Sequence, residues 1–237
     1  MKAAIFDLGH TLIDYYNDWA IPEARAVRRF YKAAESKLDV DEKEFCASLV
    51  EILVEGRRHK LVDMKEIPLA EPLAQALVAG GAEPSAGLLK KGNKIFYEVL
   101  VEDRHLVPGS REMLEELRDR GYRIGLISDV AWGLPSEYPL ADMRFYHLDS
   151  LFDDLIFSSD AMLRKPHPEL FRMALRNLDA EVEESVYIGN SPLFDVMGAN
   201  GVGMRSVLKE APYFDACAEA VPDLTISNWD ELLEYLA

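Results

Sequence analysis

Residues 108–237 repeat one local pattern, a helical stretch followed by a short apolar strand. Pro108 and Gly109 precede the first unit, a predicted helix from Ser110 to Arg120 and a predicted strand at 122–127. Strands that alternate with helices of this length form a parallel sheet with right-handed crossovers. We therefore predict an α/β core, a Rossmann-like doubly wound parallel sheet. Its other predicted elements are helices at 136–148, 168–178 and 229–236, strands at 154–158, 185–188 and 204–207, and a final apolar position at Ile226.

The N-terminal part of the chain follows a different pattern. Residues 2–8 (KAAIFDL) are a short apolar run that Gly9 interrupts, which predicts a buried first strand ending at a turn. Helical patterns follow without an intervening strand. We therefore predict an all-helical domain, residues 15–106, inserted after the first strand of a core made of residues 1–14 and 107–237. The helical patterns lie at about 17–38, 41–60, 67–79 and 84–103.

The charge of the chain limits its partners. The formal net charge is −16 over 237 residues, which repels nucleic acid and anionic membranes over long distances. No apolar run approaches the ~20 residues of a membrane helix, and the first residues do not resemble a cleavable signal. Cys46 and Cys217 lie far apart without a metal-binding spacing, which indicates plain thiols. We expect a cytoplasmic monomer or homodimer that acts on a small molecule.

Polar residues stand where the predicted strands end. Asp7 ends the first strand, Ser128 and Asp129 end the strand RIGLIS, and Lys165 follows the SSDAML segment. The strand VYI leads into Gly189, Asn190 and Ser191, with Asp195 shortly after. In open α/β sheets ligands bind beyond the carboxyl ends of the strands. These residues are therefore expected to form one site.

The strings DLGHTL, ISD, RKPHPELF and IGNSPLFDVMGANGVGM occur in this order along the chain. In their order, spacing and position at strand ends, they resemble the four motifs of the haloacid dehalogenase-like superfamily. The resemblance covers essentially the whole chain and points to the subgroup with a helical cap between the first and second motifs. It implies a hydrolase in which a carboxylate acts as covalent nucleophile.

The resemblance also implies a role for individual residues. Asp7 would be the nucleophile, Ser128 would hold phosphate oxygens, and Lys165 would supply a fixed positive charge. Ser128 could instead be a helix N-cap, Lys165 a solvated lysine, and Thr11 either a substrate-binding hydroxyl or only a turn residue. The expected set is catalytic Asp7, Ser128 and Lys165; substrate-binding Thr11, Ser128, Asp129 and Lys165; and Mg²⁺-binding Asp7, Gly9 (through its carbonyl), Asn190 and Asp195.

The chain departs from the family's phosphatases at Gly9, where they carry an Asp that acts as general acid and base. Without it, assistance of roughly 10²–10⁴-fold is missing, and simple alkyl phosphates should be poor substrates. His10 is the nearest ionisable side chain that could replace this Asp, although a His in a turn is more often a solvated turn residue. Dehalogenases of the family also lack this Asp, but they place an aromatic residue there. Phe194 matches the aromatic residue that they place before the last Asp.

The second departure is Asn190, which stands where the phosphatases place a charged Mg²⁺ ligand. An amide oxygen is still a hard ligand, but it brings no charge and should bind Mg²⁺ more weakly. The favoured function is a Mg²⁺-dependent phosphatase that acts on a small phosphorylated metabolite through an aspartyl-phosphate. The alternatives are a metal-free 2-haloacid dehalogenase and a catalytically weak binding or regulatory protein with the same fold.

The inserted domain carries side chains that could contact the substrate. Tyr15, Tyr16 and Trp19 follow the first motif and could line the entrance, although core packing explains Trp19 as well. A basic cluster that faces the cleft would attract an anion, whereas most such clusters are solvated helix faces. The basic clusters are Arg25, Arg28, Arg29 and Lys32; Arg57, Arg58, His59 and Lys60; and Lys90, Lys91 and Lys94.

Overall fold

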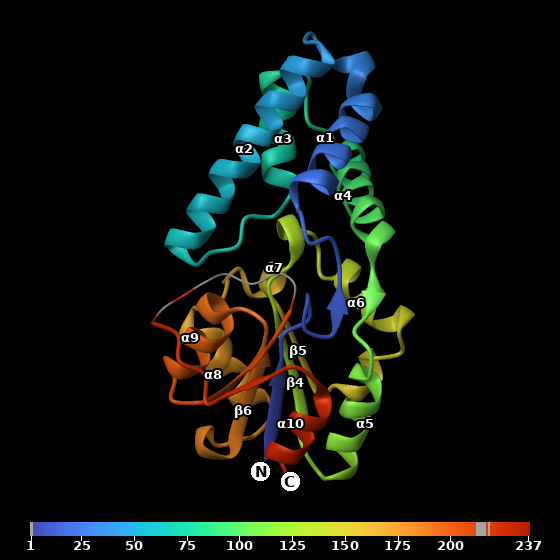
Figure 1. Ribbon diagram of the computed structural model, residues 1–237. Helices are drawn as coiled ribbons and strands as arrows, with labels where there is room; N and C mark the ends of the chain where they lie inside the picture. Colours follow the sequence, from blue (N-terminus) through green and yellow to red (C-terminus); the bar gives the residue numbers. More distant parts are fainter. Residues whose placement is uncertain (1, 212–216, 218) are drawn as a thin grey trace.

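The core of the chain is a six-stranded parallel sheet in the order β5-β4-β1-β6-β7-β8 (Figure 1). The computed structural model describes residues 2–211, 217 and 219–237. The chain moves outward from the inner strand β1 in both directions, which confirms the predicted doubly wound α/β fold. The strands are β1 (Ala3–Phe6), β4 (Arg123–Ser128), β5 (Asp154–Phe157), β6 (Ser185–Gly189), β7 (Arg205–Lys209) and β8 (Leu224–Ile226).

Helices cover both faces of this sheet, which explains why its inner strands read as continuous apolar runs. In β1, Ala3 and Ile5 pack in one cluster with α8 (Pro168–Asn177) and α9 (Met197–Asn200). Ala4 and Phe6 pack in the other cluster with α5 (Ser110–Asp119) and α10 (Trp229–Tyr235). Since both faces are buried, the edge at the carboxyl ends of the strands is where a ligand can approach.

Four helices stand beyond that edge and form the cap (Figure 1). The side chain of Asp41 accepts a hydrogen bond from the backbone N–H of Glu44 and so caps the long second helix of the set. That helix buries Phe45, Leu49 and Leu53, which recur at helical spacing. The sequence therefore predicts these helices correctly, with ends that differ by a few residues. They are α1 (Ala20–Ala34), α2 (Glu42–Asp63), α3 (Ala70–Ala79) and α4 (Ala86–Leu100).

A short antiparallel ribbon lies where the chain passes between core and cap. It consists of β2 (Ile13–Asp14) and β3 (His105–Leu106), with Ile13 paired to Leu106. The sequence does not predict it, because two residues are too few to show the alternation of a strand. The domain boundaries at 14/15 and 106/107 stay a prediction, and the ribbon lies next to both.

The cap also touches the core through the connection between α2 and α3. The backbone N–H of Glu66 donates to the carbonyl of Met162 at 3.2 Å, and that of Arg164 donates to the carbonyl of Met64 at 2.8 Å. Lys65 and Leu163 form an antiparallel bridge between these two hydrogen bonds. This segment of the cap is therefore paired with the core loop that leads into Lys165.

Several short helical elements differ from the sequence-based expectation. The SSDAML segment, expected as a loop, begins with the one-turn helix α7 (Ser158–Ala161). The helix expected at 136–148 is the shorter α6 (Glu137–Phe145). The fourth motif forms a π-helical turn over Pro192–Val196, which no residue pattern distinguishes from an ordinary helix start. Cys46 and Cys217 are free thiols, as expected. No helix in the described part of the chain is long and apolar enough to cross a membrane.

We predict that Gly198→Ala destabilises the fold by about 1–3 kcal/mol, because a Cβ at Gly198 would overlap the fully buried ring of Phe171. The matched control is Gly56→Ala in the middle of α2, where a Cβ meets no atom within 4 Å. That change should stabilise by about 0.5–1 kcal/mol through helix propensity. Urea denaturation measures both. Equal effects of the two substitutions would contradict the packing described between α8 and α9.

Candidate active site

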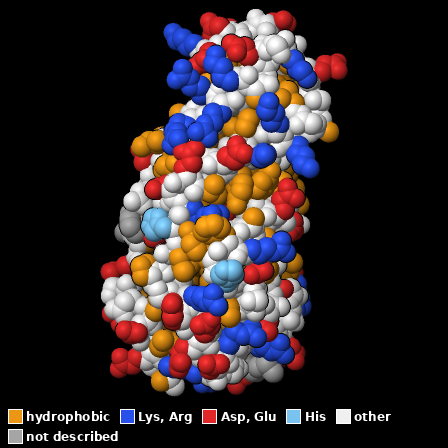
Figure 2. Space-filling view, turned by 90° about the vertical axis from the view of Figure 1, so that its right-hand side faces the viewer, with side chains coloured by type: hydrophobic (Ala, Val, Ile, Leu, Met, Phe, Trp, Pro, Cys, Tyr) orange, Lys and Arg blue, Asp and Glu red, His pale blue; other side chains and the backbone are white. Residues whose placement is uncertain are grey.

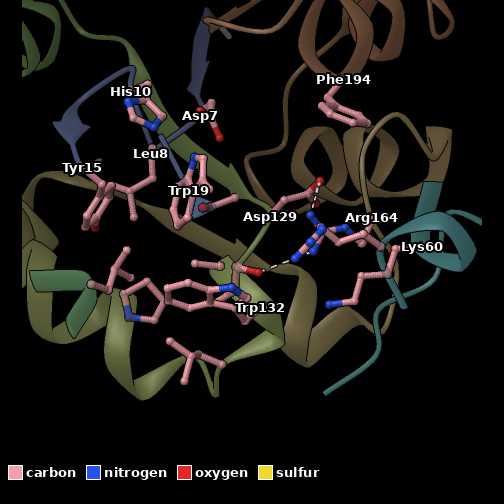
Figure 3. Close-up of a pocket in the computed structure, with 18 of the residues that line it drawn as sticks. Asp7, Leu8, His10, Tyr15, Trp19, Lys60, Asp129, Trp132, Arg164 and Phe194 are labelled. Carbon is pink, nitrogen blue, oxygen red and sulfur yellow. Dashed lines mark hydrogen bonds and ion pairs between the residues drawn. The ribbon is translucent and has the colours of Figure 1, made fainter. Parts of the chain in front are cut away.

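The expected site residues come together at the carboxyl ends of three strands. Asp7 follows β1, Ser128 is the last residue of β4, and Asn190 follows β6. Lys165 reaches the same place from the loop between α7 and α8. All four line a cavity of about 710 Å³ between core and cap. Figure 3 shows Asp7 among the residues around this cavity. Figure 2 shows hydrophobic side chains gathered across the middle of the molecule, at the level where the cap meets the core.

The ammonium group of Lys165 connects the acidic residues of the site. Its Nζ lies 2.6 Å from Oδ1 of Asp7 and 2.7 Å from Oδ1 of Asp195, and it donates to the hydroxyl of Tyr187 at 3.2 Å. These three partners match the three N–H donors of a lysine. Lys165 is only 4% exposed. It is therefore a buried ion-pair partner and not a solvated surface lysine.

Burial changes the ionisation of this cluster. Burial by itself would lower the pKa of Lys165, but the carboxylates of Asp195 and Asp7 outweigh this effect and hold the pKa well above its usual value. For Asp7, burial is the largest effect and raises the pKa to about 6, although the Lys165 ammonium acts in the opposite direction. Two buried carboxylates thus share one buried cation, and the site can accept further positive charge.

Asp195 is held in a fixed orientation. Its Oδ2 accepts a hydrogen bond from the backbone N–H of Ser191 at 2.9 Å, and its Oδ1 lies 3.2 Å from the hydroxyl of Tyr187. Gly189 permits this arrangement, because a Cβ there would overlap the carboxyl group of Asp195. Asp195 therefore acts first as the partner of Lys165, and a direct contact with a metal stays a prediction.

Thr11 joins Asp7 to the fourth motif. Its hydroxyl donates to Oδ2 of Asp7 at 3.1 Å and lies 3.4 Å from Oδ1 of Asn190. The oxygens of Asp7 and Asn190 therefore both lie near the Thr11 hydroxyl, and Gly9 lines the same cavity. Carboxylate, amide and carbonyl oxygens are the ligand types of a hard cation. Among the described residues, no group of three His, Cys, Asp or Glu side chains is placed to hold a metal, so a cation here would depend on the amide and carbonyl oxygens.

Ser128 and Asp129 occupy different positions. Ser128 ends β4, lines the cavity and is not a helix N-cap. Asp129 also lines the cavity, but its Oδ1 accepts the backbone N–H of Lys165 at 3.1 Å and its Oδ2 lies 3.4 Å from Arg164. The carboxylate of Asp129 therefore holds the lysine loop in place. The predicted contacts of both residues with substrate remain predictions.

A second charged cluster lies beside the first, and its centre was not predicted from the sequence. Glu66 of the cap is buried and accepts hydrogen bonds from Arg164 at 2.6 Å and from Ser158, and it also pairs with Lys60. Arg164 and Lys60 line the cavity (Figure 3). The RKP string contained the signal for Arg164, but Glu66 has no neighbouring motif that distinguishes it from other cap carboxylates.

The basic clusters of the cap have different surroundings. In the second cluster, Arg57 and Lys60 line the cavity, and Arg57 pairs with Glu23. The first cluster forms ion pairs on the cap surface with Glu35, Glu42 and Glu102, away from the residues that line the cavity. Lys90, Lys91 and Lys94 are not among the cavity-lining residues. Only the second cluster contributes to the described cavity.

The residues after the first motif are placed as follows. Tyr15 and Trp19 line the cavity, whereas the hydroxyl of Tyr16 accepts a hydrogen bond from Arg25. His10 also lines the cavity and is 5% exposed, so it is not a solvated turn residue. Its ring lies edge-on to those of Tyr15 and Trp19, and its Nδ1 is 3.4 Å from Oδ1 of Asp14.

Comparisons with known proteins agree with this arrangement. The family model described as haloacid dehalogenase-like hydrolase matches residues 1–203. A glyceraldehyde 3-phosphate phosphatase of Pyrococcus abyssi is 36% identical over 43% of this chain, and the match spans only 41% of that protein's length. A glyceraldehyde 3-phosphate phosphatase of Methanopyrus kandleri is 27% identical over 100% of this chain and 97% of its own.

A solved structure is similar over the full length. The 2-haloacid dehalogenase from Pseudomonas syringae has a TM-score of 0.70 and 25% identity, and the match covers 100% of this chain and 98% of that one. The chain is thus similar to proteins that break two different kinds of bond. These similarities alone do not distinguish between the two reactions.

We predict that Lys165→Met costs about 3–5 kcal/mol of stability, because it leaves the buried carboxylates of Asp7 and Asp195 without their cation. The control is Lys209→Met, since Lys209 donates to the backbone carbonyl of Glu210, and its loss should cost about 1 kcal/mol. Asp7→Asn should cost less than Lys165→Met, because Lys165 keeps Asp195. Thermal and urea unfolding measure the free energy of unfolding of each variant. A Lys165→Met protein as stable as the Lys209→Met protein would rule out the buried ion pairs.

Proposed function

The chain belongs to the haloacid dehalogenase-like hydrolase family, and from this membership we propose that it is a phosphatase with Asp7 as its nucleophile. The observation that supports the proposal most is the buried contact between Asp7 and Lys165 at 2.6 Å, at the end of a central strand and inside a large cavity. The substrate would be a small phosphorylated molecule. Relatives named as phosphatases, one of them matched over nearly its full length, point the same way.

In the first step, a carboxylate oxygen of Asp7 attacks the phosphorus atom. A bond forms between this oxygen and phosphorus, the bond from phosphorus to the ester oxygen breaks, and the leaving group departs with the electron pair. Ser128 would hold the phosphoryl oxygens in position, and the fixed positive charge of Lys165 would stabilise them. In the second step, water attacks phosphorus, loses a proton to solvent, and restores the Asp7 carboxylate with release of inorganic phosphate.

Mg²⁺ is the proposed cofactor. Asp7, the carbonyl of Gly9 and Asn190 would hold it, with Asp195 nearby, and the convergence of the Asp7 and Asn190 oxygens on Thr11 fits this set. The two buried carboxylates with one lysine also leave negative charge for a divalent cation to balance. When bound, the cation would neutralise charge on the phosphoryl group. With one amide in place of a carboxylate, the site should bind Mg²⁺ weakly.

The dehalogenase alternative rests on Gly9, Phe194 and the similar solved structure. In that reaction water attacks the carboxyl carbon of an ester formed on Asp7, whereas a phosphatase adds water to phosphorus. We favour the phosphatase because the sequence relatives carry that name, and because the buried Lys165 pair argues against a mere binding protein. We also propose, as expected from the sequence, a cytoplasmic monomer or homodimer with no nucleic acid or membrane partner.

Asp7→Asn should reduce kcat for phosphate-ester hydrolysis by at least about 10³-fold, because the amide is not a nucleophile. The matched control is Asp154→Asn, at the amino end of β5 and so at the opposite edge of the sheet. That variant should retain its activity. Released phosphate measures both rates. Near wild-type turnover by the Asp7→Asn protein would eliminate Asp7 as the nucleophile.

Asn190→Asp should lower the Mg²⁺ concentration that gives half-maximal activity, because a carboxylate adds charge to the ligand set. Asn228→Asp is the control, since Asn228 caps α10 far from the ligand set and Asp caps a helix equally well. Titrations with Mg²⁺ should show a lower half-maximal concentration, for activity and for thermal stabilisation, in the Asn190→Asp protein alone. If neither half-maximal concentration changes, the cation binds elsewhere.

A further inference from the structure

The cavity has an aromatic side that the proposed phosphoryl chemistry does not use. The rings of Tyr15, Trp19, Tyr97, Trp132 and Tyr138 line it, and all but Tyr15 are only half-buried. Tyr15, Trp19 and Trp132 lie on one side of the cavity, and Arg164 and Lys60 lie on the other (Figure 3). We call these five rings the aromatic wall. A volume of about 710 Å³ lies in the range that encloses a drug-sized ligand.

Two tyrosine hydroxyls of the aromatic wall are already bound to protein. The hydroxyls of Tyr15 and Tyr97 each donate to the carboxylate of Asp142 at 2.7 Å. Asp142 is 1% exposed and also pairs with Arg104. These tyrosines therefore present ring surface, and not free hydroxyls, to a molecule in the cavity.

Trp132 belongs to the core and is held in position by three residues of the cap. Its Nε1 donates to Glu23 of the cap at 2.9 Å, and its ring lies edge-on to Trp19 and Phe96 with centroids 5.5 and 5.2 Å apart. Its backbone has φ 53°, in the left-handed region that large side chains rarely adopt. A strained aromatic residue that is fixed by its neighbours marks a position built to face a ligand.

The position that normally supplies a proton to the leaving group has no side chain. A Cβ placed on Gly9 meets no atom within 4 Å, so the space beside Asp7 is open. Without a general acid there, fast departure requires a leaving group that is stable as an anion. A phenolate meets this requirement, and its ring matches the wall.

From these two independent observations, we propose that the leaving group is an aromatic ring system, so that the substrate is an aryl phosphate ester. This inference rests on the proposed phosphatase function and names its substrate class. The phenolic oxygen leaves phosphorus with its electron pair and takes a proton from solvent. The ring would lie against Trp132 and Tyr138, and the phosphoryl group would lie at Asp7, beside its contact with Lys165.

Two other ligand classes fit less well. A sugar or triose phosphate would need hydrogen-bond partners for its hydroxyls, and on the aromatic wall the hydroxyl protons of Tyr15 and Tyr97 are already donated to Asp142. A quaternary ammonium group would suit an aromatic cage, but the adjacent carboxylates of Asp142 and Glu23 are already neutralised by Arg104 and Arg57. Its alkyl oxygen would also be a poor leaving group. Both classes enter the test as competitors.

The test compares 1-naphthyl phosphate with acetyl phosphate, whose leaving group is also stable as an anion but has no ring. Trp132→Leu and Tyr138→Leu should each lower the naphthyl-to-acetyl ratio of kcat/KM by about three- to tenfold, mainly through KM. Trp229→Leu is the control, because Trp229 packs on Phe6 in the core outside the cavity. It should leave the ratio unchanged. Titration calorimetry with 1-naphthyl phosphonate, an unreactive analogue, should show the same loss of affinity in the two wall variants.

Gly9→Asp tests whether the missing general acid limits the choice of leaving group. It should raise kcat for glycerol phosphate, whose alkoxide needs a proton, far more than for 1-naphthyl phosphate. The open space at Gly9 and its ordinary φ leave room for this side chain.

The outcomes separate the two proposals. One outcome would overturn the aryl substrate and leave the proposed phosphatase activity intact. In it, the protein hydrolyses acetyl phosphate, shows no preference for naphthyl phosphate over glycerol phosphate or phosphocholine, and the wall variants have unchanged ratios. No hydrolysis of any ester, acetyl phosphate included, would overturn the phosphatase itself. A naphthyl preference that both wall variants reduce and the Trp229→Leu protein retains would support the proposal.

Discussion

The buried ammonium of Lys165 is the interaction on which the site depends. It contacts Asp7 and Asp195 at 2.6 and 2.7 Å, and all three side chains are buried. Removing two carboxylates from water is costly, and only a cation with satisfied hydrogen bonds offsets this cost. The sheet supplies that geometry, because β1 and β6 are neighbours and end at the same edge. The hydroxyl of Tyr187 completes the set of acceptors.

The cap contributes to the site through two of its glutamates, which hold core side chains at the cavity. Glu66 reaches Arg164, the residue before Lys165, while Glu23 holds the indole of Trp132. The cap thus fixes one charged and one aromatic side chain at the cavity. We infer from this division that the charged residues of the core serve the proposed reaction and that the side chains held by the cap contact the rest of the substrate.

The sequence predicts the sheet and the ends of its strands well, because buried parallel strands between helices leave a strong local pattern. Asp7, Lys165, Asn190 and Asp195 could be found for the same reason, since each follows such a strand or lies in a motif. Glu66 and Trp132 could not, because their importance comes from contacts between segments distant in sequence. Tyr187 gave a weak signal, as a tyrosine inside a buried strand needs a partner for its hydroxyl.

The central claim is that Asp7 carries the phosphoryl group, and mass spectrometry of acid-quenched protein tests it most directly. The protein would be mixed with 1-naphthyl phosphate in heavy-oxygen water and stopped within one turnover. With no side chain at Gly9 to activate water, the intermediate should accumulate, and the phosphoryl group should map to Asp7 while heavy oxygen enters inorganic phosphate. A phosphoryl group on another residue, or heavy oxygen in the Asp7 carboxylate, would contradict the account.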